Sequence, residues 1–513
     1  MIKINNIKLP VDHSPEDFCL ALAKKLHISP YDLRSFKIIR KSLDSRKKPA
    51  LYYVYSVETD TKIPKKYVRG DLSFVDHSEI KLNITGTLSL INRPIIIGAG
   101  PSGLFCGLYL SRMGFSPLII ERGRKVEDRK KDVERFLREG ILDEDSNVSF
   151  GEGGAGTFSD GKLNTAIHDR EGYVTSVLNE FTKLGADPSI MYEAKPHVGT
   201  DRLEGIIKNI RSLIEDNGGE FLFESKVNGI YRKDDRIRIS LSDKRIMESN
   251  CVVLAVGNAS REIFSFLYGD GLHMEAKPIA VGYRVEHPQD MIDEYVYGSA
   301  RNKYDLPSAS YKLTCRADGG RGVYSFCMCP GGYVINSSTE RGFLCINGMS
   351  YSKRDGKNAN SAIIMTVNTD EIEGESPLKM MDFQREIERT AFLRENGRVL
   401  RQPFGEYKKD SFGKGLRGIL PKDLEQSFLF GMEHFGKIIP GFDDPSSMVY
   451  AVESRSSSPV RILRNERMES RSSSFIYPIG EGAGYAGGIT SSAADGIKAA
   501  MMIAKKYKVG RYV

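Results

Sequence analysis

The segment Arg93-Pro-Ile-Ile-Ile-Gly-Ala-Gly-Pro-Ser-Gly103 decides the fold of this chain, because it joins a buried apolar strand to a helix through a glycine-rich turn. In such a turn, Gly98 makes the tight bend, Gly100 lets a pyrophosphate approach the backbone, and Gly103 lets the helix touch the strand. The helix N-terminus presents free N–H groups and a positive partial charge to the phosphates. The segment therefore predicts a dinucleotide-binding unit.

The elements that follow complete this signature. The helix is predicted to run to about Met113, and a second buried strand, Pro117–Ile120, leads to Glu121. Glu121 lies 23 residues after Gly98, where an acidic side chain receives the ribose hydroxyls of a dinucleotide. A later buried strand, Cys251–Gly257, is expected to return to the same parallel sheet, which predicts an α/β fold.

A second glycine cluster, Gly151–Gly161, contains five glycines among eleven residues. So many glycines make a helix or strand costly in backbone entropy. The cluster is typical of a loop pressed against a flat or phosphorylated ligand. The alternative is a flexible surface loop, but the apolar side chains of Phe150, Phe158 and Leu163 favour a docked one.

Three separated motifs resemble those of FAD-binding proteins of the glutathione-reductase-like superfamily: Gly98–Gly103 with Glu121, Val253–Gly257, and Gly480–Gly488 with the helix predicted after it. Over essentially the whole chain, the sequence is more closely similar to a bacterial family of FAD-dependent dehydrogenases, the NAD(P)/FAD-dependent oxidoreductases. That closer resemblance rests on Phe150–Lys162, Cys327–Gly332, Glu453–Arg455 and Gly480–Gly488. The chain departs from the superfamily at Glu481, where Asp is usual, and the extra methylene implies a shifted contact or a bridging water.

The resemblance implies an α/β fold in which a Rossmann-like FAD-binding domain carries an inserted mixed α+β substrate domain. It also implies a non-covalently bound FAD. On reduction a flavin gains negative charge at its pyrimidine edge, which a helix N-terminus stabilises by roughly 0.3–2 kcal/mol. The residues implied in FAD binding are Gly98, Gly100, Pro101, Ser102, Gly103, Glu121, Arg122, Gly156, Thr157, Val227, Gly257, Gly480, Glu481, Gly487, Gly488 and Ile489.

The chain is therefore expected to be an FAD-dependent oxidoreductase acting on an unidentified small molecule. It has one GxGxxG-plus-acid unit and no CxxxxC or CxxC pair, which disfavours disulfide reductases that carry their own NAD(P)H domain. NADH or NADPH is expected only as a transient reductant. A flavin monooxygenase is the alternative enzyme.

Candidate substrate contacts are Lys162 and Arg455, because an Arg near a flavin can orient a carboxylate or phosphate. Cys327 and Cys329 are two apart and would share one face of a strand. Such a pair can shuttle electrons through a strained, oxidising disulfide, but two small core residues are the favoured interpretation. No CxxC or HxxxH spacing is present, so no metal site is predicted.

Residues 1–92 are predicted to form a small basic α+β module. They contain a helix capped by Ser14, two strands at Ser35–Lys41 and Leu51–Glu58, and a short strand near Glu79–Ile84. The module holds sixteen Lys or Arg against ten Asp or Glu, which is +6 of the total +7. Basic residues beside tyrosines suit single-stranded RNA, but a solvated hairpin is the favoured interpretation.

The 513 residues exceed one ordinary core, so several domains are expected. The predicted division is 1–92, then 93–262 as the first part of the FAD-binding domain, 263–436 as the substrate domain and 437–513 as the FAD-binding domain's C-terminal part. Seven irregularly spaced Cys make no disulfide framework. No apolar leader and no clean apolar run of about 20 residues occurs, which predicts a cytoplasmic protein without a membrane partner.

Overall fold

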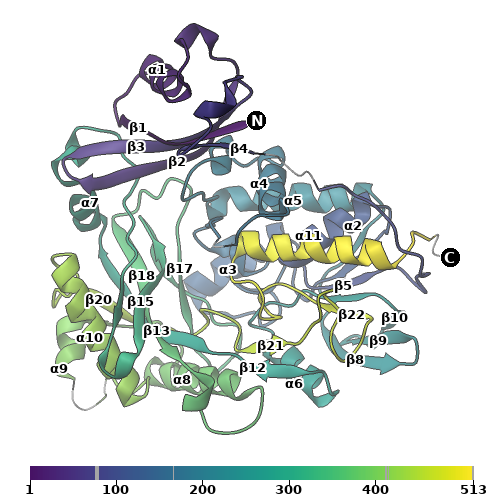
Figure 1. Cartoon of the computed structure of the whole chain (residues 1–513). Helices are drawn as coiled ribbons and strands as arrows, with labels where there is room; N and C mark the ends of the chain where they lie inside the picture. Colours follow the sequence, from purple (N-terminus) through teal and green to yellow (C-terminus); the bar gives the residue numbers. More distant parts are fainter. Residues whose placement is uncertain (76–79, 166, 411–412, 414, 511–513) are drawn as a thin grey trace.

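The computed structural model describes residues 1–75, 80–165, 167–410, 413 and 415–510. It is a mixed α/β fold of parallel and antiparallel sheets. Figure 1 shows a parallel sheet and its helices on one side of the molecule, an antiparallel sheet on the other, and a separate module at the N-terminal end. Among the helices of the described residues, none is long and apolar enough to cross a bilayer.

A five-stranded sheet, parallel throughout, forms the centre of one half of the molecule, which is called the first half below. Its strands are short and apolar because both faces are covered by other elements. The β11 strand pairs directly with β5, which confirms that the chain returns to the sheet it began. In sheet order the strands are β22 (Ile476–Pro478), β11 (Val252–Leu254), β5 (Ile95–Ile97), β6 (Leu118–Ile120) and β7 (Glu220–Leu222).

Two helices that are far apart in the sequence lie side by side near this sheet (Figure 1). These are α2 (Pro101–Arg112), which follows the glycine-rich turn, and α11 (Ile489–Lys506). They approach so closely that a Cβ on Gly496 would lie 2.2 Å from the Ser102 carbonyl oxygen. The other elements of this half are α3 (Val126–Glu139), α4 (Tyr173–Lys183), α5 (Thr200–Asp216), α6 (Arg261–Gly269) and the meander β8 (Val227–Lys233), β9 (Arg236–Leu241) and β10 (Ile246–Ser249).

An antiparallel sheet of six strands forms the second half. Because β20 pairs with both β13 and β19, this sheet extends past residue 436. The end of the substrate domain, predicted at residue 436, must therefore move beyond β20. In sheet order the strands are β14 (Thr314–Arg316), β15 (Gly322–Cys329), β18 (Asn358–Val367), β13 (Ile279–Pro288), β20 (Met448–Glu453) and β19 (Leu400–Pro403).

Helices and two small sheets complete this half. The helices are α7 (Gln289–Tyr297), α8 (Lys379–Glu395), α9 (Phe404–Lys409) and α10 (Lys422–Ile438). The strands pair as β12 (Met274–Ala276) with β21 (Val460–Ile462), and β16 (Tyr333–Asn336) with β17 (Ile346–Met349).

The N-terminal module is a four-stranded sheet with one helix, in the order β2-β3-β1-β4. Ser14 caps the helix, as predicted, by accepting a hydrogen bond from the Asp17 N–H at 3.1 Å. Part of the strand predicted at 79–84 lies outside the described residues, and residues 80–84 form no strand; β4 lies earlier. The elements are β1 (Ile2–Pro10), α1 (Pro15–Leu26), β2 (Phe36–Lys47), β3 (Ala50–Thr59) and β4 (Leu72–Phe74).

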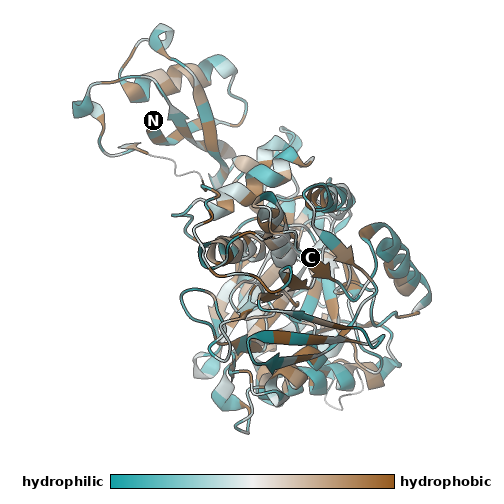
Figure 2. Cartoon of the chain, turned by 90° about the vertical axis from the view of Figure 1, so that its right-hand side faces the viewer, coloured by the Kyte–Doolittle hydropathy of each residue, from teal (hydrophilic) through white to brown (hydrophobic). Residues whose placement is uncertain are grey.

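This module projects from the rest of the molecule (Figure 2) but is joined to both halves through the β2–β3 hairpin. The Lys41 backbone exchanges hydrogen bonds with Tyr192 (2.6 Å) and Ala194 (2.8 Å) in the first half. Lys48 donates to the Tyr295 carbonyl oxygen in the second half. Two of the basic residues therefore serve as docking contacts. RNA binding through residues 1–92 stays a prediction.

Candidate functional site

A cavity of about 640 Å³ lies between the carboxyl ends of the parallel strands and the six-stranded sheet. Gly98 and Gly257, which follow β5 and β11, border one side, and Phe326 and Glu453, from β15 and β20, border the other. The volume is in the range of small-molecule and cofactor sites. Ligands of open α/β sheets bind at this edge of the sheet.

The structure brings most of the predicted cofactor residues together around this cavity. Gly103, Thr157 and Gly480 do not line it. A Cβ on Gly103 would lie 1.9 Å from the Gly98 carbonyl oxygen, so this glycine permits the close helix–strand packing expected of it. The predicted residues that do line the cavity are Gly98, Gly100, Pro101, Ser102, Glu121, Arg122, Gly156, Val227, Gly257, Glu481, Gly487, Gly488 and Ile489.

Glu121 directly follows β6 and binds three backbone segments beside the glycine-rich turn. Its buried carboxylate accepts hydrogen bonds from the N–H groups of Ala99 (2.8 Å), Gly123 (3.0 Å) and Gly151 (3.0 Å). A carboxylate offers about four acceptor positions. One position therefore remains for a hydroxyl group in the cavity, as a ribose requires.

The glycines at the cavity wall fit a flat, phosphorylated ligand. A Cβ on Gly257 or Gly487 would meet no protein atom within 4 Å, so a side chain there would project into the open cavity. Gly100 and Gly488 are the N-caps of α2 and α11, so two helix N-termini border the same space. The two helix N-termini can donate hydrogen bonds to phosphate, and the free acceptor position of Glu121 can bind a ribose hydroxyl. Together these groups fit FAD.

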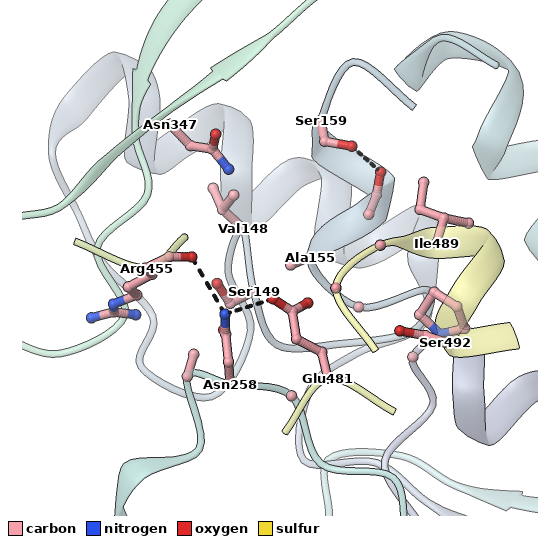
Figure 3. A pocket seen from close by; sticks show the side chains of 18 of the residues that line it. Val148, Ser149, Ala155, Ser159, Asn258, Asn347, Arg455, Glu481, Ile489 and Ser492 are labelled. Atoms are coloured by element: carbon pink, nitrogen blue, oxygen red, sulfur yellow. Dashed lines mark hydrogen bonds between the residues drawn. The ribbon is translucent and has the colours of Figure 1, made fainter. Parts of the chain in front are cut away.

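Glu481 and Asn258 face each other across this part of the cavity (Figure 3). The Asn258 amide donates to Glu481 Oε1 at 3.0 Å and to the Arg455 carbonyl oxygen at 3.4 Å. Burial raises the pKa of Glu481 to about 7, against the opposing effects of Lys277 and of the Asn258 hydrogen bond. Sequence reasoning missed Asn258, because a lone Asn after a strand carries no spacing signal.

This raised pKa predicts a pH-dependent stability of the apoprotein. Between the unfolded pKa near 4.5 and the folded pKa near 7, the folded state keeps the Glu481 proton and the unfolded state loses it. Stability therefore falls as pH rises through this window. We expect Glu481→Gln to flatten this part of a plot of melting temperature against pH. Parallel curves for the variant and the wild type would contradict the assignment.

Arg455 makes contacts within the protein that the sequence does not reveal, and its role as a substrate contact stays a prediction. Although it lines the cavity, its guanidinium is held by Glu388, at 3.0 and 2.8 Å, and donates to Thr339 Oγ1 at 2.7 Å. All three of its nitrogens are therefore engaged within the protein. Glu388, on α8, therefore occupies the edge of the Arg455 guanidinium with which a substrate carboxylate could form two parallel hydrogen bonds.

Lys162 lies at the cavity wall in a polar cluster. Its Nζ is 3.2 Å from Asp160 and 4.0 Å from the sulfur atoms of both Cys327 and Cys329. Asp160 also pairs with Arg354, and despite its burial these two cations keep the pKa of its carboxyl below the usual value. Sequence reasoning missed Asp160 and Arg354, because the tertiary fold brings them together.

Lys195 adds a further cation to this wall and donates to Ser310 Oγ at 2.7 Å. Burial lowers its pKa, and the charges of Arg354 and Lys162 lower it further. The wall facing the glycine motifs is therefore rich in positive charge. In the described part of the chain, no group of three His, Cys, Asp or Glu side chains is placed to hold a metal ion.

The sheets, the glycine-rich turn and the cavity together define a mixed α/β protein whose cavity lining fits a dinucleotide. Residues 278–456, which include all six strands of the antiparallel sheet, match the family described as "FAD-dependent protein, C-terminal domain-like". Residues 1–60 match a family described as a domain of unknown function. The chain is 41% identical, over 99% of both sequences, to an uncharacterized protein of Clostridium beijerinckii, and it belongs to the family of that protein.

Several solved structures are similar to this chain at low sequence identity and low TM-score. The tetracycline destructase Tet(51) is 13% identical with a TM-score of 0.35, and 81% of each chain is covered. The flavin-dependent halogenase CmlS is also 13% identical, with a TM-score of 0.39 over 80% of this chain and 58% of that one. The CtdE structure with FAD is 12% identical, with a TM-score of 0.34 over 80% and 83%.

Proposed function

We propose that this protein is an FAD-dependent oxidoreductase that passes hydride or electrons through a non-covalently bound flavin to or from a small-molecule substrate. One observation carries the proposal: a single cavity is bordered by the glycine motifs of the parallel sheet and by the cationic wall near the antiparallel sheet. When bound, FAD supplies the redox chemistry, and the protein supplies orientation and electrostatics.

Residues on one side of the cavity are proposed to bind the cofactor, and residues on the other side to bind the substrate. Glu121 and the N-termini of α2 and α11 bind the ribose, phosphate and developing negative charge of the cofactor. On the other side, Lys162, Lys195 and Arg354 bear more positive charge than Asp160 neutralises. A substrate with a carboxylate or similar anionic group would relieve their mutual repulsion. We therefore propose a small anionic substrate.

The proposal predicts a protein that is purified with bound FAD and whose flavin absorption band bleaches under anaerobic titration with NADH or NADPH. The nucleotide binds transiently in this scheme, because the chain has one dinucleotide-binding unit. If neither nucleotide bleaches the band, electrons come from the substrate or from another protein. After bleaching, oxygen uptake coupled to substrate oxygenation would favour the flavin monooxygenase alternative.

The outcome that would contradict the proposal is a folded protein that neither retains FAD nor takes it up on addition. Arg354→Met provides a test of the substrate side. We expect this variant to retain FAD and to bleach with the same nucleotide, because Arg354 lies at the wall facing the glycine motifs.

A further inference from the structure

A β-bulge places Cys327 and Cys329 in different environments at the cavity wall. The register of β15 against β18 shifts between Phe326 and Cys329, and Cys327 has a positive φ of 45°. Bulges re-aim a side chain beside functional sites. Cys327 accordingly lines the cavity and is partly exposed there, whereas Cys329 is fully buried. The bulge interrupts the regular strand on which the expected shared face depends, but both sulfur atoms still lie 4.0 Å from Lys162 Nζ.

The two sulfur atoms share one cation and one backbone contact. Lys162 Nζ lies 4.0 Å from each sulfur, and the Cys329 thiol donates to the Cys327 carbonyl oxygen at 3.3 Å. Arg284 also donates to that carbonyl, at 3.2 Å. All seven cysteines of the chain are free, so no disulfide links the two members of this pair.

The charges facing Cys327 come from several elements. Lys162 and Arg284 are positive, whereas Asp160, Glu453 and Glu481 are negative. The interaction of its side chain with that of Cys329, together with the two cations, lowers the pKa of Cys327 well below that of an ordinary thiol, although desolvation opposes this shift. The same interaction raises the pKa of Cys329. Cys327 is therefore the member of the pair that loses its proton more readily.

We propose that Cys327 and Cys329 form a dithiol site that reduces small anionic disulfides, with Cys327 as the attacking thiolate and Cys329 as the resolving thiol. The thiolate lies at the cavity surface, where a substrate can reach it. The buried partner lies behind it, and Lys162 holds negative charge on either sulfur during the exchange.

Two displacement steps balance this reaction. The Cys327 sulfur attacks one sulfur of the disulfide R–S–S–R, so that a Cys327–S–S–R bond forms and RS⁻ leaves. Cys329 then gives its proton to that thiolate and attacks the Cys327 sulfur, which forms the Cys327–Cys329 disulfide and releases a second RS⁻. Two electrons pass from the protein to the substrate, and the products are one RSH and one RS⁻.

The cationic wall selects the charge of the substrate. Lys195 and Arg354 line the same cavity as Cys327, so carboxylates on a small disulfide would bind beside the attacking sulfur. A disulfide between residues two apart is strained and oxidising, so the exchange needs an excess of the substrate disulfide to run toward it, and the dithiol is readily restored afterwards. Repeated turnover rests on the proposed function, because a bound flavin would supply the two electrons for that restoration, whereas the exchange itself needs no cofactor.

The test is a single-turnover reaction of the purified holoprotein with dithiobis(nitrobenzoate), a disulfide that carries two carboxylates. A Cys19→Ser/Cys315→Ser background removes the two partly exposed cysteines outside the site. In this background we expect two nitrothiolates released per chain and a disulfide-linked peptide containing both Cys327 and Cys329 by mass spectrometry. The added variant Cys329→Ser should release one and keep a mixed disulfide, and Cys327→Ser should release none.

Lys162→Met tests the positioning role of the lysine. We expect the pH midpoint of the exchange to rise by roughly one unit or more and the rate at neutral pH to fall about tenfold, since the thiolate is the attacking form. Lys162→Arg should restore most of the rate. The wild type should also react faster with the anionic probe than with neutral dithiodipyridine.

Equal release from the Cys327→Ser variant, or an exchange midpoint near 8.5 as in a free thiol, would overturn the proposal. FAD retention, recorded on the same samples, separates the two proposals. Loss of exchange in a flavin-bearing protein counts against the dithiol site alone, and exchange in a protein that cannot bind FAD counts against the proposed function alone.

Discussion

Replacing Gly257 with leucine is expected to abolish FAD retention while the protein stays folded. Gly257 follows β11 and borders the cavity, and a Cβ built there meets no protein atom within 4 Å. The leucine side chain would occupy the space of the cofactor without disturbing its own surroundings. Forcing several extra carbons into an occupied site costs a few kcal/mol, so affinity should fall by about a hundredfold or more.

Flavin absorption and fluorescence of the purified variant, followed by titration with FAD, measure this effect. Gly205→Leu is the matched control. Gly205 lies on the exposed face of α5 away from the cavity, and its Cβ position is equally open. Both apoproteins should melt at the temperature of the wild-type apoprotein. Normal FAD content in Gly257→Leu would show that the cofactor does not lie against β11.

Glu388→Ala is expected to give the largest loss of stability. Glu388 is fully buried on α8 and accepts two hydrogen bonds from each of Arg261 and Arg455, at 2.6–3.0 Å. Despite its burial, the two arginines hold the pKa of its carboxyl far below the usual range. Removing the acid leaves two buried cations facing each other, which costs about 3–5 kcal/mol.

Chemical unfolding of Glu388→Ala, followed by circular dichroism, measures this loss. Glu386→Ala on the same helix is the control, because Glu386 is exposed and its removal should change stability by no more than about 0.5 kcal/mol. Since the pKa of Glu388 is depressed, its contribution is complete above pH 4.5 and is lost as pH falls. Equal stability of the two variants would contradict this account.

Local sequence patterns were sufficient to predict the elements that follow a single periodicity or a single known motif. The glycine-rich turn, its helix and the strand that returns to the sheet could all be predicted. The first strand, β1, was missed because its apolar alternation is interrupted. Ile2 and Ile4 keep a period of two, but the register shifts before Ile7, where Asn6 has a φ of 57°. A bulge of this kind hides a strand from periodicity analysis.

Helix capping and the side-chain contacts of the site could not be predicted from the sequence, for a related reason. Asp201, an acid of the type that often caps helices, lies in the first turn of α5, but Gly199 is the N-cap, and the Asp201 carboxylate accepts hydrogen bonds from Ser352. The role of Arg455 likewise depends on Glu388. These partners lie far apart in the sequence, so the local pattern gives no sign of them.

The position of α11 and β22 has a consequence for the order of biosynthesis. The parallel sheet begins near residue 95, but its edge strand β22 and the glycines that close the cavity lie within the last forty residues. Domains fold as the chain emerges from the ribosome, N-terminal first. Here the central strands stay partly uncovered until β22 and α11 have been synthesised. We therefore expect cofactor capture to follow the synthesis of α11, and the nascent chain to expose the apolar face of α2 to chaperones until then.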